Sequence, residues 1–168
     1  MERRRSQVLD AQARRNLRVS KRSRAVPSLG DMFVMQLPTK TYLAGRVVLA
    51  NVEPGRCPVP GAHLLYIYRK QLAAPKLDYS HMRSDQLVIA PVWTNSFAWT
   101  NGNFETVDTG ELILSDLLPQ HCFYRTSTGK YVDELGNVLS QRIEPCGQWG
   151  LVSYRWIEDH VADVSANC

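Results

Sequence analysis

The 168-residue sequence predicts a mainly β fold of the β-rich α+β class: a twisted antiparallel sheet or partly open barrel with a C-terminal helix and a basic N-terminal arm. Three observations lead to this prediction. Apolar and polar residues alternate with period 2 in several segments, turn residues recur roughly every 8 to 12 positions, and a helical apolar period appears near the C-terminus. We expect an arm at residues 1–27 and one β-rich domain at residues 28–168.

Positive charge is concentrated in the arm. Residues 1–24 contain nine basic and two acidic residues, a net charge of +7, whereas the rest of the chain contains 11 basic and 14 acidic residues, a net charge of −3. Residues 6–17 include good helix formers but few apolar residues to bury, so we expect the arm to be flexible or partly helical. Such an arm could bind nucleic acid or an acidic partner, or act as a solubilising leader.

The first expected strands form a hairpin within residues 30–48, and Gly30-Asp31 provides a turn signal before it. Three prolines and two glycines make residues 51–63 a loop. The pattern then predicts a strand at residues 63–68, a short helix or irregular crossing at 72–84, and a strand at 86–95 that Pro91 confines to an edge or a bulge.

The second half continues with short strands. Asn101-Gly102 predicts a tight turn between two strands of residues 96–107, and two further turns are expected at residues 127–129 and 135–137. Ser153 is a suitable cap for a final helix. Its expected apolar face is formed by Tyr154, Ile157, Val161 and Val164, with Glu158, Asp159 and Asp163 on the outside.

Catalytic and metal-binding patterns are weak in this sequence. Its four cysteines, Cys57, Cys122, Cys146 and Cys168, have no C-x-x-C spacing and follow no apolar signal segment, which favours reduced thiols in a soluble cytoplasmic protein without a membrane span. The four histidines lack metal-ligand spacing. We predict no catalytic residue, cofactor or metal, although a Cys-His nucleophile using Cys146 or Cys57 stays open as an alternative.

Carboxylates cluster at three places in the body. The first two clusters consist of Glu105, Asp108, Glu111, Asp116, Asp133 and Glu134, and the third lies on the C-terminal helix. Paired carboxylates can serve acid–base catalysis, but nothing in the sequence fixes their separation. Such clusters are commonly a solvated face, and the functional alternative is a docking surface for a basic partner.

Several short motifs resemble the immunity protein 26 family of bacterial polymorphic-toxin systems. They are the opening Gly30-Asp31-x-Phe33, the second strand with Tyr42 and Gly45-Arg46-Val47, and the segment Gly147-x-Trp149-Gly150. We interpret this last segment as a tight turn that lets the indole pack in the core. The resemblance spans about residues 28–160, and the chain departs from the family in its longer arm and its proline-rich residues 54–60.

The resemblance implies a non-enzymatic protein that binds and neutralises a cognate toxin, with the hairpin as scaffold. Many such toxins are nucleases with basic clefts, which the acidic residues of the body would suit. The alternative is a small nucleic-acid-binding β-barrel whose residues 1–24 grip phosphates. A cysteine-dependent enzyme is a third class, and it predicts fast, pH-sensitive alkylation of one thiol.

Overall fold

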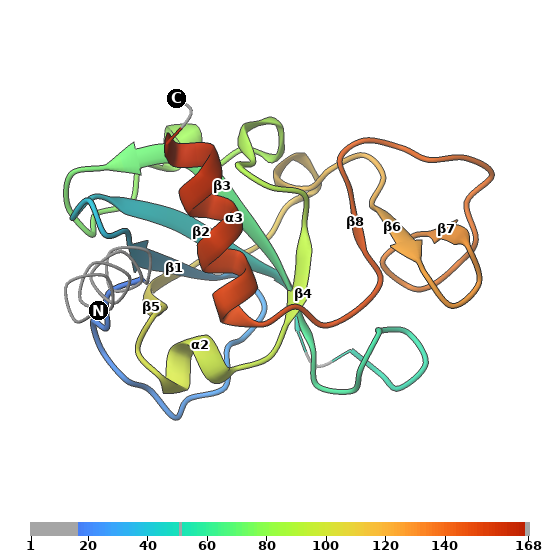
Figure 1. The fold of residues 1–168 in the computed structure, drawn as a ribbon, viewed down its shortest axis with the longest axis horizontal. Helices are drawn as coiled ribbons and strands as arrows, with labels where there is room; N and C mark the ends of the chain where they lie inside the picture. The colour runs from blue at the N-terminus through green and yellow to red at the C-terminus, as the bar shows by residue number, and fades with distance from the viewer. Residues whose placement is uncertain (1–16, 51, 167–168) are drawn as a thin grey trace, which may run out of the picture.

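The computed structural model describes residues 17–50 and 52–166. Within these residues, eight strands form two sheets (Figure 1). The main sheet has the order β4-β3-β2-β1-β5, and every neighbouring pair is antiparallel. Its strands are β1 (Asp31–Gln36), β2 (Tyr42–Leu49), β3 (His63–Leu72), β4 (Val92–Thr94) and β5 (Glu105–Thr109). The mainly β prediction is confirmed, and the sheet is open rather than closed into a barrel.

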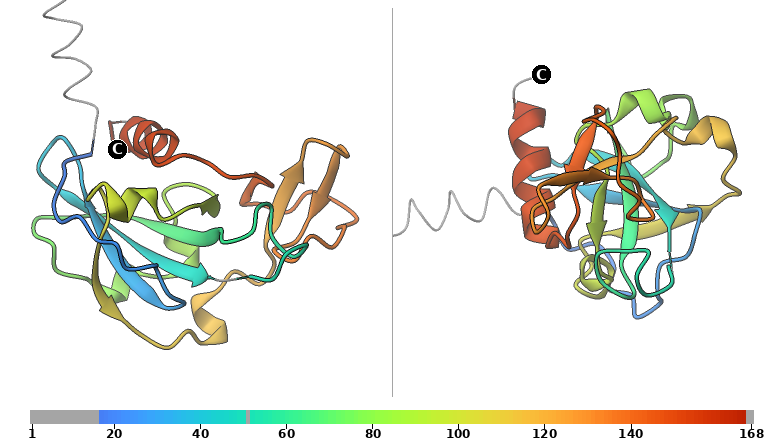
Figure 2. Two further views of the ribbon diagram at one scale, coloured as in Figure 1. Left: turned by 90° about the horizontal axis from the view of Figure 1, so that it is seen from below. Right: turned by 90° about the vertical axis from the view of Figure 1, so that its right-hand side faces the viewer.

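Both faces of the main sheet are covered. Inward-facing residues such as Phe33, Met35 and Val47 pack against α2 (Phe97–Thr100) and the C-terminal helix α3 (Tyr154–Ala166). The opposite face, which includes Tyr66 and Tyr68, packs against the irregular segments that carry three short 3-10 helices. These are η1 (Tyr79–His81), η2 (Ser84–Gln86) and η3 (Leu114–Asp116). Figure 2 shows α3 above the sheet and η3 below it.

The second sheet lies beside one end of the main sheet (Figure 1). It contains β6 (Cys122–Arg125), β7 (Lys130–Val132) and β8 (Cys146–Gln148) in the order β7-β6-β8, with β8 parallel to β6. The turns predicted near Gly129 and Gly136 are present, and both glycines adopt positive φ angles, 65° and 85°. Parallel pairing of β6 with β8 is a long-range contact that the turn pattern does not predict.

Four predicted features differ from the structure. Residues 97–100 form the helix α2 instead of a strand, because the chain turns back there and buries Ala98 and Trp99. The strand expected at residues 86–95 is limited to Val92–Thr94 after Pro91, and β3 extends to Leu72 beyond its predicted end. Gly147 belongs to β8 and is not part of a turn.

Helix α3 begins as predicted, because the Ser153 hydroxyl accepts a hydrogen bond from the Trp156 amide at 3.1 Å. Ile157 and Val161 are fully buried, and Asp159 and Asp163 are exposed. Glu158 was expected on the outer face but is only 2% exposed. It is buried because the chain at Leu17 crosses this helix, and the Leu17 amide donates to the Glu158 carboxyl group at 3.0 Å.

The described part of the N-terminal arm lies against the body. Leu17 is buried in the core, Arg18 forms a β-bridge with Gln36, and the Ser23 amide donates to the Trp99 carbonyl at 3.0 Å. The helix predicted within residues 6–17 lies almost wholly outside the described residues. Across the described ranges, no helix is long and apolar enough to span a membrane.

Candidate functional site

Three of the predicted docking carboxylates lie along one rim of the molecule. Glu105 and Asp108 are on β5, which forms an edge of the main sheet, and Glu111 follows that strand. Asp108 and Glu111 are exposed, and Glu105 is half-buried. The Ser20 hydroxyl donates to Glu105, and the Tyr79 hydroxyl donates to Asp108 and lowers the pKa of that carboxyl group. Asp108 is therefore ionised at neutral pH.

Exposed apolar side chains adjoin these carboxylates. Ile113, directly before η3, is 58% exposed, and Leu114, the first residue of η3, is 90% exposed. Figure 2 shows β5 and the chain leading to η3 along the outer rim of the molecule. We call Glu105, Asp108, Glu111, Ile113 and Leu114 together the acidic edge. An apolar anchor within a charged rim is the usual composition of a protein-binding surface.

Asp116 has an internal structural contact. Its carboxylate lies 3.0 Å from Nη1 of Arg46, a guanidinium group that is 7% exposed on β2. Arg46 also donates to the carbonyl groups of Gly110 and Glu111 at 3.2 and 2.8 Å, and Asp116 accepts the Ile113 amide at 3.1 Å. This network fixes the 110–116 segment onto the sheet, so the Asp116 carboxylate is largely satisfied within the molecule.

Glu134 is half-buried and belongs to a chain of hydrogen bonds that links the two sheets. Its carboxylate lies 3.1 Å from Nδ1 of His121, and Nε2 of His121 lies 2.6 Å from the Tyr66 hydroxyl. The hydrogen bond with His121 lowers the pKa of Glu134, and burial raises the pKa of Tyr66 to about 12. Carboxylate, imidazole and hydroxyl follow one another as in a nucleophilic site, but Tyr66 is fully buried, so the chain serves as a link between sheets.

Asp133 stabilises the turn that follows β7. Its carboxylate accepts hydrogen bonds from the amides of Leu135 and Asn137, each at 2.9 Å, and from the Asn137 side chain at 2.9 Å. An aspartate that bonds backbone amides in this way holds a local turn. Of the six predicted carboxylates, Asp116, Asp133 and Glu134 thus stabilise the fold, and the other three lie on the acidic edge.

The residues of the predicted structural motif near the first hairpin lie where two chain segments are in close contact. Gly30 has a φ of +85°, and a Cβ there would lie 2.2 Å from the Gly110 carbonyl oxygen. Asp31 accepts hydrogen bonds from the Ser28 amide at 2.9 Å and the Thr109 hydroxyl at 2.7 Å. Phe33 lies over Gly45 in the hairpin. These contacts fix the hairpin as a scaffold.

Trp149 is half-buried and packs against the core, whereas Gly147 lies in β8 and not in the predicted turn. The centroid of its ring lies 5.9 Å from that of Trp93 and 6.1 Å from that of Phe123. The Arg125 guanidinium carbon lies 4.9 Å from the centroid of the Trp149 ring. A Cβ on Gly147 would lie 2.4 Å from the Pro91 carbonyl, so this glycine allows close approach of β8 to the chain before β4, whereas Gly150 faces open space.

The described thiols are distributed between two environments. Cys57 is buried, with Sγ 3.2 Å from the Val59 carbonyl oxygen. Cys122 and Cys146 lie opposite each other on β6 and β8, with their sulfur atoms 3.2 Å apart. Burial, followed by the neighbouring Cys122 thiol, raises the pKa of Cys146 to about 12, which disfavours a reactive thiolate. Residues 17–50 and 52–166 contain no cluster of three potential metal ligands.

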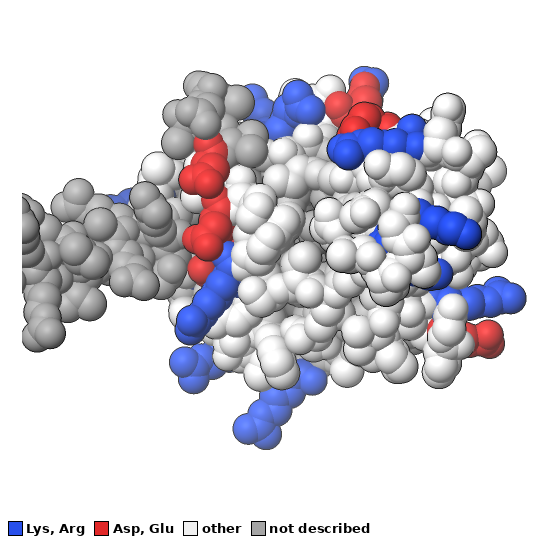
Figure 3. All heavy atoms as spheres, turned by 45° about the vertical axis from the view of Figure 1, so that its right-hand side comes forward, with Lys and Arg blue, Asp and Glu red and all other residues white. Residues whose placement is uncertain are grey.

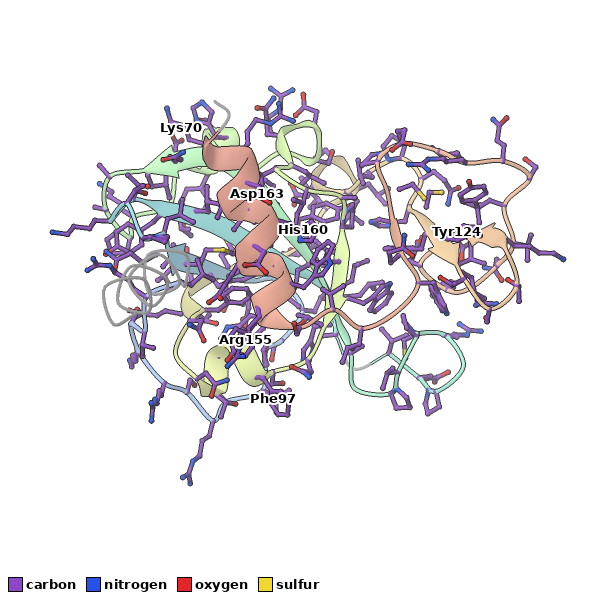
Figure 4. The ribbon with its side chains drawn as sticks, in the orientation of Figure 1. Lys70, Phe97, Tyr124, Arg155, His160 and Asp163 are labelled. Atoms are coloured by element: carbon purple, nitrogen blue, oxygen red, sulfur yellow. The ribbon has the colours of Figure 1, made fainter. Side chains whose placement is uncertain are left out.

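A large face of the molecule carries few charges (Figure 3). A cavity of about 160 Å³ lies between β4, β8 and α3 and is lined by Ala90, Val92, Cys146, Gly147, Gln148, Val152 and Trp156. Trp156 also stacks on His160, with 3.6 Å between the ring centroids. Figure 4 shows His160 with Arg155 and Asp163 along the outer side of α3. Sequence reasoning missed this region, since Trp156 falls outside the predicted apolar face of the helix.

These features define a small β-rich protein with an open sheet edge that carries exposed carboxylates and exposed apolar side chains. The family model for immunity protein 26 matches residues 28–132, from the start of β1 through β7. The chain therefore belongs to the immunity protein 26 family, as the sequence motifs indicated. The comparisons with curated proteins and with solved structures gave no match. The acidic edge lies within the matched residues, and β8 and α3 follow them.

Proposed function

We propose that this protein binds a cognate bacterial toxin and neutralises it stoichiometrically, without catalysis. The observation that carries the proposal is the match of residues 28–132 to the immunity protein 26 family. The geometry is consistent with it, because the Tyr66 hydroxyl of the Tyr66–His121–Glu134 chain is buried and Asp108 and Glu111 are exposed on an outer rim. Neutralisation by binding requires an accessible surface and no reaction centre.

The acidic edge is the proposed docking surface. Glu105, Asp108 and Glu111 place three carboxylates along β5 and the residue segment that follows it. Toxins that act on nucleic acids carry basic clefts, and opposite charges accelerate association and select the partner. A nuclease domain is therefore the partner class that this surface fits best.

Leu114 is the proposed anchor of the interface. Its side chain is 90% exposed, and the Ile113 side chain beside it is 58% exposed. Binding would therefore remove the apolar surface of both side chains from water. Affinity in protein interfaces is concentrated in a few such residues, and charged residues around them contribute mainly to association rate and selectivity. The Arg46–Asp116 network holds the anchor in place.

The function is tested by capture followed by growth rescue. The tagged protein is used to capture partners from lysate of its source cells at moderate salt after nuclease treatment, and the partners are identified by mass spectrometry. Each captured toxin domain is then expressed in a sensitive host with or without this protein. Restored growth supports the proposal. A captured set in which no domain is toxic, or toxicity that co-expression leaves unchanged, contradicts it.

A further inference from the structure

Cys122 and Cys146 form a thiol pair positioned for reaction. They face each other as Cα partners in the parallel pairing of β6 with β8, and their sulfur atoms lie 3.2 Å apart. Neighbouring strands lie about 4.8 Å apart, within the range of Cα separations that disulfides span. A disulfide needs sulfur atoms about 2.05 Å apart, so closure requires a movement of roughly 1 Å.

One thiol of the pair is accessible to a small oxidant. Cys146 is half-buried and lines the cavity of about 160 Å³ between β4, β8 and α3. Cys122 is 1% exposed, and its sulfur accepts the Ile143 amide at 3.4 Å. An oxidant molecule of a few atoms fits the cavity, so it would meet Cys146 first and leave Cys122 to resolve the product.

We propose that Cys122 and Cys146 are an oxidant-sensitive dithiol that hydrogen peroxide converts into an intrachain disulfide. Cys146 is mostly protonated at neutral pH, because its pKa is raised to about 12, so only its small ionised fraction attacks the peroxide. In this step an S–O bond forms, the O–O bond breaks, and the departing hydroxide takes up a proton to give water. The Cys122 sulfur then attacks the resulting sulfenic acid. An S–S bond forms, the S–O bond breaks, and a second water leaves with the Cys122 proton. Two thiols and one peroxide thus give one disulfide and two waters.

The disulfide would stabilise the second sheet. It closes the chain between positions 122 and 146, a sequence separation of 24 residues that includes β7 and Glu134. Closing a loop of this size restricts the unfolded chain, and we expect the melting temperature to rise by about 5 to 10 °C. Because the pKa of Cys146 is raised to about 12, its oxidation rate should increase about tenfold per pH unit between pH 7 and pH 9.

The test treats the full-length reduced protein with hydrogen peroxide, blocks remaining thiols with N-ethylmaleimide and maps disulfide-linked peptides by mass spectrometry. The expected product is a Cys122–Cys146 link, formed at the same rate in Cys57→Ser and absent in Cys146→Ser. The second measurement is the melting temperature of oxidised and reduced samples. For each variant, the oxidised sample is compared with the reduced sample of the same variant. Cys122 and Cys146 both recovered alkylated, or linked to other cysteines, would overturn the proposal.

Discussion

Gly45 and Phe33 are in close contact across the first hairpin. They are paired opposite each other on β2 and β1, and a Cβ on Gly45 would lie 2.3 Å from Cζ of Phe33. The same ring stacks on Phe104 with 4.7 Å between centroids and meets Trp99 edge-on at 5.2 Å. Two aromatic neighbours thus restrict movement of the Phe33 ring away from Gly45.

We therefore expect Gly45→Ala to lower the free energy of unfolding by about 2 to 3 kcal/mol, because the core must shift to admit one methyl group. Gly150→Ala is the matched control, since no atom lies within 4 Å of its Cβ position. Urea denaturation followed by tryptophan fluorescence measures both. Equal stability of the two variants would show that the Gly45–Phe33 contact is looser than described.

Glu158 introduces a pH dependence at the junction of α3 with the arm. Burial raises the pKa of its carboxyl group from 4.5 to about 7, despite the hydrogen bond from the Leu17 amide. Between these two pKa values the folded state binds more protons than the unfolded state, so the free energy of unfolding falls as pH rises from about 4.5 to above 7.

The variant Glu158→Gln should remove this slope, since the amide oxygen still accepts from Leu17 and carries no charge. At pH 8 we expect the variant to exceed the wild type in stability by on the order of 2 kcal/mol. Thermal melts at several pH values between 4.5 and 8 measure the effect. Glu53→Gln, at an exposed glutamate whose charge is not among those that shift the pKa of Glu158, should keep the slope of the wild type; a parallel response of both variants would contradict the assignment to Glu158.

At the scale of elements, the Arg46–Asp116 pair attaches η3 to the main sheet. Its guanidinium group is 7% exposed and its carboxylate 24% exposed, and the pair is supported by two backbone carbonyl groups. A buried cation that loses its partner is costly, whereas an exposed pair contributes little. The same segment presents Leu114, so its stability matters for the docking surface.

Asp116→Ala should lower the free energy of unfolding by about 2 to 4 kcal/mol, since it leaves the Arg46 charge without its carboxylate. The exposed pair Arg83–Asp85 provides the control, and Asp85→Ala should change stability by less than about 0.5 kcal/mol. Chemical denaturation compares the two. A small loss for Asp116→Ala would return this carboxylate to the set available for partner binding.

The sequence predicts elements well where the pattern is local. The hairpin, the glycine turns near 129 and 136 and the cap at Ser153 depend on neighbouring residues, and the structure confirms them. Helix α2, the parallel pairing of β8 and the burial of Glu158 depend on segments far apart in the chain, and no local period encodes them. The same distinction separates the structural carboxylates from the exposed ones: Asp116 and Asp108 differ in their partners, not in their sequence context.

At the scale of the whole molecule, the acidic edge is a rim where charge and exposed apolar surface coincide. The acidic edge lies within the residues that match the immunity protein 26 family, and the rest of the body supports it. Capture of nucleic acid through the basic arm is the competing account. It predicts that binding is lost on substitution of Lys21, Arg22 and Arg24 and is insensitive to changes on the acidic edge.

The most direct test measures the affinity of the captured toxin domain for the wild-type protein and for Glu111→Lys combined with Leu114→Ser, by isothermal titration calorimetry. We expect the Kd of the double variant to rise at least about tenfold, because the partner loses both the opposite charge and the apolar anchor. Glu53→Lys, an exposed glutamate outside the acidic edge, should retain the wild-type Kd. An unchanged Kd for the double variant, with its fold intact by circular dichroism, would contradict docking at this edge.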